Sequence, residues 1–191
     1  MEDHEGCQEE AVGPTGADVK DLFREVAQTL ILALLLALII RGYFVETYLV
    51  YGPSMEPSLF EGERLLVNKL VYRFRDPSPG EVIVFREPGV DGRNLVKRVV
   101  AVDGQKIEVR NGDVFLDGSL VRESFVISAS SDTIPTHQVP EGTIFVMGDN
   151  RANSLDSRYF GPVDTESVRG RAFIIFWPLS RFNILSSFVS P

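Results

Sequence analysis

The chain has 191 residues, of which 44% are hydrophobic and 24% are charged, so a wholly disordered or collagen-like protein is excluded. Its formal net charge is −8, and residues 1–19 contribute −6 of this through six acidic side chains and no Lys or Arg. The remainder is nearly neutral and lacks the basic face that a nucleic-acid partner requires. One cysteine, Cys7, and two histidines, His4 and His137, are too few for a disulfide framework or a Cys/His zinc site. We therefore expect no nucleic acid, metal or other cofactor.

The first two elements in chain order are an acidic tail and an apolar segment. Residues 1–23 have the acidic, glycine-containing composition of a flexible tail. The stretch Leu30–Ile40 has no polar residue, and its extension to Val26–Val45 is 20 residues long. A helix of that length spans about 30 Å, which is the thickness of the hydrocarbon core of a bilayer. We predict one transmembrane helix over residues 24–45 and the lipid bilayer as a partner.

Two other interpretations of the apolar segment compete with a membrane anchor. A buried core helix usually carries a polar stripe, whereas this stretch is apolar on all sides. A cleaved signal peptide ends in a small-x-small exit, and none precedes Arg41. Lys20 and Arg24 lie before the segment and Arg41 follows it. The positive-inside rule therefore favours a single-pass protein of the plasma or inner membrane, with a cytoplasmic N-terminus and an extracytoplasmic remainder.

From residue 46 onward the pattern changes to short β-type runs separated by turn residues. These runs are Arg64–Lys69, Glu81–Phe85, Asn94–Val102, Lys106–Arg110, Asp113–Leu116, Gly142–Met147 and Arg171–Trp177. Asn111-Gly112, between two of the runs, is a strong signal for a tight hairpin. Residues 123–139 are rich in Ser, Thr and Pro, so we expect an irregular loop there. We predict a mostly β domain over residues 46–191, sandwich-like or barrel-like, with a small inserted β excursion at about 105–140.

The first segment whose residues could take part in a reaction surrounds Ser54. Gly52 and Pro53 precede this serine, and Met55, Glu56 and Pro57 follow it. Proline restricts its own backbone and that of the residue before it, so the serine hydroxyl and the neighbouring N–H would point in fixed directions. A serine that merely belongs to a proline-rich loop is the simpler alternative.

The second segment is the run Asn94–Val102, which contains Lys97 and Arg98. Alternate residues of a strand share a face, so the two cations lie on opposite faces among aliphatic residues. In a sheet covered on one side, one cation would point inward and the other outward. Keeping an ordinary lysine neutral at pH 7 costs roughly 4.6 kcal/mol, and burial removes much of this cost by lowering the pKa. An inward Lys97 would then be a usable base for a serine hydroxyl, whereas Arg98 stays charged; the alternative is that both cations are solvated.

The third segment is Gly148–Gly161, which directly follows an apolar run. It contains two carboxylates, two arginines and two serines, one of which is Ser154. One interpretation is a polar surface loop held by Asp–Arg pairs. The functional interpretation is a rigid hydrogen-bonded loop in which Ser154 holds a lysine amine in place.

Taken together, the segments resemble the bacterial type I signal peptidases, which are membrane-anchored Ser-Lys proteases that remove signal peptides. The resemblance covers residues 24–178 and depends on four boxes behind an anchor. The boxes are Ser54-Met55-Glu56-Pro57, Arg64-Leu65-Leu66-Val67-Asn68-Lys69, Lys97-Arg98-Val99, and a last box made of Gly148-Asp149-Asn150-Arg151 and Ser154-Leu155-Asp156-Ser157-Arg158. The resemblance implies a signal-peptidase-like β catalytic domain, pre-proteins with signal peptides as substrates, and cleavage after small-x-small sites.

The resemblance also implies roles for individual residues. Ser54 would be the nucleophile, neutral Lys97 the general base, and Ser154 the residue that orients the lysine amine. The loop that shapes the site would consist of Gly148, Asp149, Asn150, Arg151, Asp156 and Arg158. The pockets for small substrate side chains would be formed by Val50, Leu59 and Val96, together with Tyr48 and Leu95.

The chain departs from the family pattern at two positions. Gly52 stands where some members have a serine whose hydroxyl completes the oxyanion hole, so the second oxyanion donor stays open. Ser58 replaces the usual threonine and keeps a hydroxyl. Two alternative functions also remain at this point. One is a self-cleaving Ser-Lys repressor, although the chain lacks the Ala-Gly or Cys-Gly dipeptide that such proteins cut. The other is a non-catalytic, membrane-anchored β module.

Overall fold

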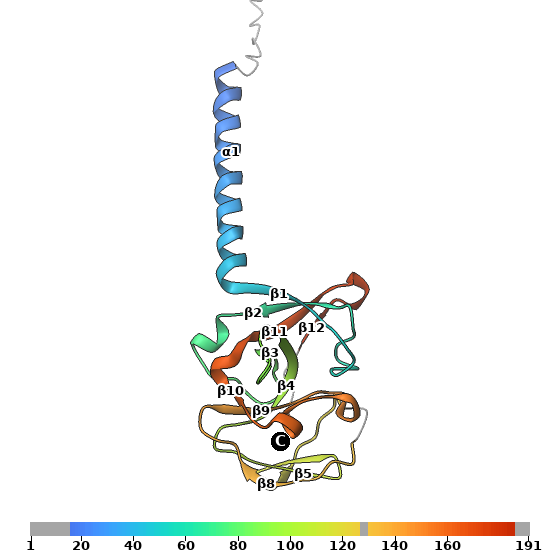
Figure 1. Ribbon diagram of the computed structural model, residues 1–191. Coiled ribbons are helices and arrows are strands. Elements are labelled where there is room, and N and C mark those ends of the chain that lie inside the picture. Colours follow the sequence, from blue (N-terminus) through green and yellow to red (C-terminus); the bar gives the residue numbers. More distant parts are fainter. Residues whose placement is uncertain (1–15, 127–129, 186–191) are drawn as a thin grey trace, which may run out of the picture. The chain divides into compact units, whose positions relative to one another are not determined.

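The computed structural model describes residues 16–126 and 130–185, and the chain divides into two units between Arg41 and Gly42. The first unit is the helix α1, Gly16–Ile39, which runs into a short π-helical turn, η1, at Ile40–Phe44 (Figure 1). Within the described residues, one helical stretch, Lys20–Phe44, is long and apolar enough to cross a membrane, with a mean hydropathy of 2.0. The 18-residue window that qualifies it is not buried inside the protein.

The ends of α1 differ from the sequence-based expectation. The helix begins at Gly16, whereas we expected residues up to 23 to be a flexible tail and the membrane segment to begin at residue 24. Residues 20–25 have no Gly or Pro and include good helix formers, so the helix extends beyond the apolar stretch. The part of the expected tail at residues 1–15 lies outside the described residues. Helical structure ends at Phe44, and Val45 already belongs to a strand.

The second unit is built on an antiparallel sheet of eight strands in the order β1-β2-β11-β3-β4-β9-β10, with β12 paired to β11 (Figure 1). Its strands are β1 Val45–Leu49, β2 Arg64–Asn68, β3 Val82–Arg86, β4 Asn94–Val102, β9 Thr143–Met147, β10 Val163–Asp164, β11 Val168–Trp177 and β12 Asn183–Ile184. Register shifts interrupt the pairing of β11 with β2 and β3 and that of β4 with β9. Such bulges increase strand twist, so the sheet is curled. The mostly β fold is as predicted.

A second, four-stranded antiparallel sheet is inserted between β4 and β9. Its order is β7-β6-β5-β8, with β5 Lys106–Arg110, β6 Asp113–Leu116, β7 Ser119–Leu120 and β8 Ile134–Gln138. The tight turn at Asn111-Gly112 joins β5 to β6 as the sequence indicated. The expectation of an irregular loop over residues 123–139 is wrong at its end, because β8 pairs with β5. The short elements η2 Val71–Arg73, η3 Arg151–Asn153, α2 Ser157–Phe160, η4 Thr165–Ser167 and η5 Leu179–Arg181 connect the strands.

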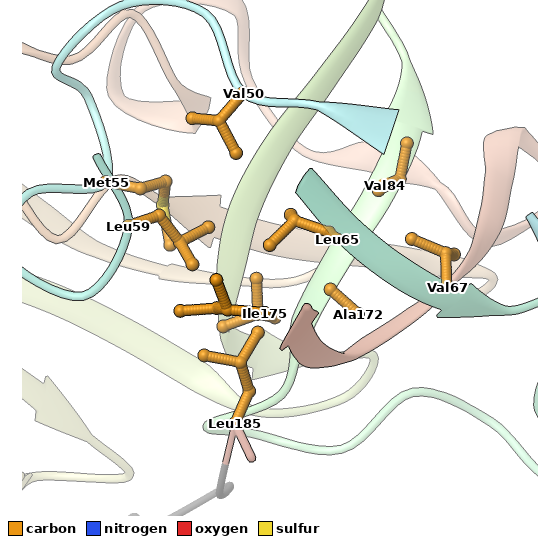
Figure 2. Packing of buried hydrophobic residues seen from close by; sticks show 10 residues of the cluster. Val50, Met55, Leu59, Leu65, Val67, Val84, Ala172, Ile175 and Leu185 are labelled. Carbon is orange, nitrogen blue, oxygen red and sulfur yellow. The ribbon is translucent and has the colours of Figure 1, made fainter. Parts of the chain in front are cut away.

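Hydrophobic side chains cover both faces of the central strands. One cluster gathers residues of β2, β3 and β11 with Met55 and Leu59 from the loop after β1, and Figure 2 shows these side chains converging. A second cluster joins Val100 and Phe145 of the main sheet to the inserted sheet, and a third contains Ile83 and Val99. The middle of β4 is therefore covered on both sides, which decides the environment of its two cations.

Candidate functional site

Ser54 lies on a short loop after β1 that is anchored in the hydrophobic core. The side chains of Met55 and Leu59, on the same loop, are fully buried in the cluster shown in Figure 2. Two backbone hydrogen bonds close the loop: Glu56 N–H donates to Pro53 O at 3.0 Å, and Leu59 N–H donates to Met55 O at 2.9 Å. The loop thus holds Ser54 in a fixed position with its side chain only half-buried.

Lys97 reaches Ser54 from the middle of β4. Its Nζ lies 2.6 Å from Ser54 Oγ, a hydrogen-bond distance, and only 3% of the lysine is exposed. Burial lowers the pKa of Lys97 to about 8, although the nearby carboxylates of Asp156, Asp149 and Glu87 oppose this change. With a pKa of about 8, roughly a tenth of the amine is neutral at pH 7. The alternative in which Lys97 is a solvated strand residue is wrong.

Arg98, the next residue of β4, is also buried, whereas we expected one cation inward and the other outward. Its side chain is 4% exposed and forms a two-pronged ion pair with Asp149, with Nε–Oδ1 at 2.8 Å and Nη2–Oδ2 at 2.7 Å. The guanidinium also donates to Gly80 O at 2.7 Å. Because both faces of β4 are covered, both cations are buried. Lys97 contacts Ser54, whereas Arg98 pairs with Asp149.

Gly148 brings the third segment against the Ser54 loop. A Cβ atom on Gly148 would lie 2.3 Å from Ser154 Oγ and 2.4 Å from Ser54 O, far inside contact distance, so only glycine fits. Asn150 adds two hydrogen bonds to the same loop, from its N–H to Ser54 O at 3.1 Å and from its Nδ2 to Pro53 O at 3.2 Å. The segments containing Ser54 and Ser154 are therefore locked together through Gly148 and Asn150.

Ser154 is buried beside this contact, and its Oγ has no hydrogen-bond partner in the part of the chain that the structure describes. No hydrogen bond joins it to Lys97 among those residues. The role inferred for Ser154 from the resemblance, orienting the lysine amine, therefore stays a prediction.

The remaining charged residues of the loop form buried ion pairs instead of a polar surface. Arg158 Nε donates to Asp156 Oδ1 at 2.8 Å, and both side chains are almost fully buried. Burial alone would raise the pKa of Asp156, but the bonds from Arg158 and from the Gly148 N–H outweigh it, so this pKa is lowered. Arg151 Nε donates to Gly148 O at 3.0 Å, and its Nη2 donates to Glu123 Oε1 at 2.6 Å. Glu123 belongs to none of the sequence motifs, so this partner could not be found from the sequence.

A cavity of about 450 Å³ opens beside the Ser54–Lys97 pair. Three of the five residues predicted to bind substrate line it: Val50, Leu95 and Val96. Leu59 is fully buried in the core and Tyr48 lines a separate hollow, so neither contributes to this cavity. The lining also includes residues that we did not predict, namely Leu49, Tyr51, Met55, Arg93, Asn94 and Leu155.

Comparison with known proteins gives a consistent result. Residues 23–177 match the protein family described as signal peptidase, peptidase S26. The chain belongs to this family. It is 40% identical over 172 residues to "Probable signal peptidase I-1" of Synechocystis sp. (strain ATCC 27184 / PCC 6803 / Kazusa), covering 86% of this chain and 88% of that protein.

Two further relatives support the signal peptidase assignment. "Probable signal peptidase I-2" of the same Synechocystis strain is 35% identical over 85% of this chain and 77% of its own length. "Signal peptidase I" of Bacillus licheniformis is 33% identical over 86% of this chain and 94% of its own length. The resemblance to type I signal peptidases is therefore confirmed. The protein is a serine endopeptidase of the signal peptidase type, in preference to a self-cleaving repressor or a non-catalytic β module.

Proposed function

We propose that Ser54 and Lys97 are the catalytic pair of this signal peptidase. One observation carries the proposal: the Lys97 amine is buried and lies 2.6 Å from Ser54 Oγ, beside an open cavity. A neutral amine at hydrogen-bond distance from a hydroxyl is what general-base activation of a serine requires. Burial keeps a useful fraction of Lys97 neutral near physiological pH because its pKa falls to about 8.

The reaction proceeds in two halves through an acyl-enzyme. Ser54 Oγ forms a bond to the scissile carbonyl carbon while its proton passes to Lys97 Nζ. The C–N bond then breaks, and the protonated Lys97 donates that proton to the leaving amine. A water molecule next attacks the ester carbonyl while giving a proton to Lys97 Nζ. The bond between that carbon and Ser54 Oγ then breaks, and the lysine returns the proton to Ser54 Oγ, which regenerates both groups. The Ser54 backbone N–H has no acceptor among the described residues, so it is free to stabilise the oxyanion.

The surrounding loop holds this geometry in place. The segment that packs against the Ser54 loop is fixed by Gly148, Asn150, Arg151 and the ion pairs of Asp149 and Asp156. We assign to Ser154 the task of accepting a hydrogen bond from the lysine ammonium after proton transfer. Support comes from its buried, unpartnered Oγ beside the Gly148–Ser54 contact.

The substrates are pre-proteins carrying signal peptides, and we propose that cleavage follows small-x-small sites. Val50, Leu95 and Val96 give the cavity apolar walls next to the reacting pair. We propose that these walls admit small side chains and exclude large ones. Leu59 and Tyr48 do not line the cavity and are left out of this proposal.

We also propose that Lys20–Phe44 anchors the protein in a plasma or inner membrane, with the N-terminus cytoplasmic and the β domain outside. The domain arrangement is then a tail, one membrane helix within Lys20–Phe44, and a catalytic domain from about residue 46. The most apolar window of this stretch is not buried inside the protein, and Lys20 and Arg24 precede its apolar core, Leu30–Ile40, whereas Arg41 follows that core. In sealed membrane vesicles of known orientation, a protease added outside should degrade the β domain only when the extracytoplasmic side faces out.

The catalytic assignment is tested with the full chain in detergent and a pre-protein containing an Ala-x-Ala site. Ser54→Ala and Lys97→Ala should each abolish cleavage while the variants keep the far-ultraviolet circular dichroism of the parent. Ser119→Ala and Lys106→Ala are matched controls, since both residues are exposed on the inserted sheet, and they should cleave normally. Normal cleavage by folded Ser54→Ala or Lys97→Ala would end the assignment.

A further inference from the structure

Four residues of the inserted region contact the arginines of the catalytic boxes. We call Glu123, Phe125, Ser130 and Asp132 the brace. Each of the three buried arginines receives one contact or more from it: Arg151 from Glu123, Arg98 from Phe125, and Arg158 from Ser130 and Asp132. These contacts lie outside the boxes that the family resemblance singles out, so the brace is an additional feature of the site.

The Glu123 contact leads to the catalytic pair in few steps. Glu123 Oε1 accepts from Arg151 Nη2 at 2.6 Å, and the two side chains are 9% and 1% exposed. The same guanidinium donates from Nε to Gly148 O at 3.0 Å. Gly148 in turn is pressed between Ser54 O and Ser154 Oγ. Two residues, Arg151 and Gly148, therefore connect the Glu123 carboxylate to the backbone of Ser54.

The Asp132 contact supports the other end of the same loop. Arg158 Nη1 donates to Asp132 Oδ2 at 2.5 Å and to Arg151 O at 2.8 Å. Its Nη2 lies 3.4 Å from Ser154 O, and the guanidinium also pairs with Asp156. The Phe125 ring completes the set, since its centroid lies 3.9 Å from Arg98 Cζ, within the range of a cation–π contact.

The inserted sheet holds the brace in turn. At the tight turn between β5 and β6, Gly112 N–H donates to Asp132 O at 3.0 Å. A Cβ on Gly112 would lie 2.1 Å from Ser130 O, so a side chain there would push the brace away. The hairpin therefore fixes the brace, and the brace contacts the catalytic loop, which gives the insertion a mechanical link to the site.

We propose that Glu123 is a positioning residue for the Ser54–Lys97 pair, acting through Arg151 and Gly148. The proposal rests on the proposed function of that pair. Arginine does not lose its proton in proteins, so Arg151 without Glu123 would be a buried cation with no carboxylate partner among the described residues. It would turn toward another carboxylate or toward water and release Gly148 O, and the Ser54 loop would lose its support. Small misplacements of reacting groups reduce turnover strongly while leaving substrate binding nearly unchanged.

The test uses Glu123→Gln, which keeps the shape of the side chain and removes its charge. Its matched control is Glu108→Gln in β5, where the glutamate pairs with an exposed Arg110 away from the catalytic boxes. For the full chain in detergent, we expect Glu123→Gln to lower kcat by about ten- to a hundredfold with KM within about twofold. Glu108→Gln should change neither constant, and Glu123→Asp, which keeps the charge, should recover part of kcat.

A double substitution checks the route through Arg151. If Glu123 acts through this arginine, kcat of Glu123→Gln/Arg151→Met should equal that of Arg151→Met alone. If the two residues act independently, the fold-reductions in kcat of the two single variants should multiply in the double variant. Multiplying losses would overturn the proposed route.

Further outcomes separate this proposal from the catalytic assignment. A normal kcat in folded Glu123→Gln, with Ser54→Ala and Lys97→Ala inactive, overturns the positioning role and leaves the catalytic pair intact. Cleavage by folded Ser54→Ala or Lys97→Ala overturns the catalytic pair itself. If Glu123→Gln does not fold, Asp132→Asn replaces it, because Asp132 is 37% exposed and Arg158 keeps Asp156. That variant should show the same selective fall in kcat, and an unchanged kcat would overturn the role of the brace.

Discussion

Replacing Lys97 with methionine should stabilise the folded protein at neutral pH while abolishing its activity. Methionine has about the same length and fills the same space without a charge. In the native protein the amine is 3% exposed, and burial lowers its pKa from 10.5 to about 8. The folded state therefore carries a charge that the unfolded chain holds more easily in water.

The size and pH dependence of the effect follow from that pKa. The difference between 10.5 and about 8 corresponds to about 3 kcal/mol, at 1.36 kcal/mol per unit. Below pH 8 the lysine is charged in both states, and the folded protein bears the full penalty. Between pH 8 and 10.5 the unfolded chain binds more protons than the folded one, so wild-type stability rises with pH and the penalty disappears. Losing the hydrogen bond to Ser54 costs about 1 kcal/mol, so Lys97→Met should gain about 2 kcal/mol at pH 7.

The measurement is urea unfolding of the full chain in detergent micelles at several pH values from 6 to 10.5. Far-ultraviolet circular dichroism follows the loss of the β strands, because Trp177, the only tryptophan, is already half-exposed in the folded protein. Lys106→Met is the control, because Lys106 is exposed on β5 and its removal should leave stability nearly unchanged. Equal stability of Lys97→Met and wild type at pH 7, or a difference that does not shrink toward pH 10.5, would refute the link between burial and the lowered pKa.

Three further predictions concern the site. In wild-type protein, kcat/KM should rise about tenfold per pH unit below pH 8 and level off above it, because only neutral Lys97 is the base; a rise continuing to pH 10 would contradict the lowered pKa. Asp149→Asn should lower the free energy of unfolding by about 3–5 kcal/mol, since it leaves the buried Arg98 without its carboxylate, and denaturant titration beside Glu108→Gln measures this. Gly148→Ala should lose cleavage, because the new Cβ meets Ser154 Oγ and Ser54 O, whereas Gly42→Ala, where nothing lies within 4 Å, should cleave normally; an active Gly148→Ala would show that this contact is dispensable.

Elements whose stability is local could be predicted from the sequence. β4 occupies the predicted residues Asn94–Val102, because its aliphatic run has no competing helical period. The hairpin between β5 and β6 follows from Asn111-Gly112. β8 was missed because Pro135 and polar residues interrupt it, which an edge strand tolerates and a central strand does not.

The catalytic boxes could be located from the sequence, but the support behind them could not. Both Lys97 and Arg98 are buried because distant segments cover both faces of β4, and the alternation of residues within the strand does not encode this. Glu123 and Arg151 are 28 residues apart, and Glu123 stands in a polar stretch without periodicity. Contacts of this kind depend on how the inserted sheet packs, so they emerge only from the folded chain.

The buried guanidinium groups have a consequence for how the enzyme responds to its surroundings. Arg98, Arg151 and Arg158 keep their protons throughout the range in which Lys97 titrates. Asp156, with its lowered pKa, is ionised across the same range. Among these four groups and Lys97, the lysine alone changes charge between mildly acidic and alkaline conditions. The pH of the surroundings therefore controls turnover through the protonation of Lys97, while the charges of the three arginines and Asp156 stay constant.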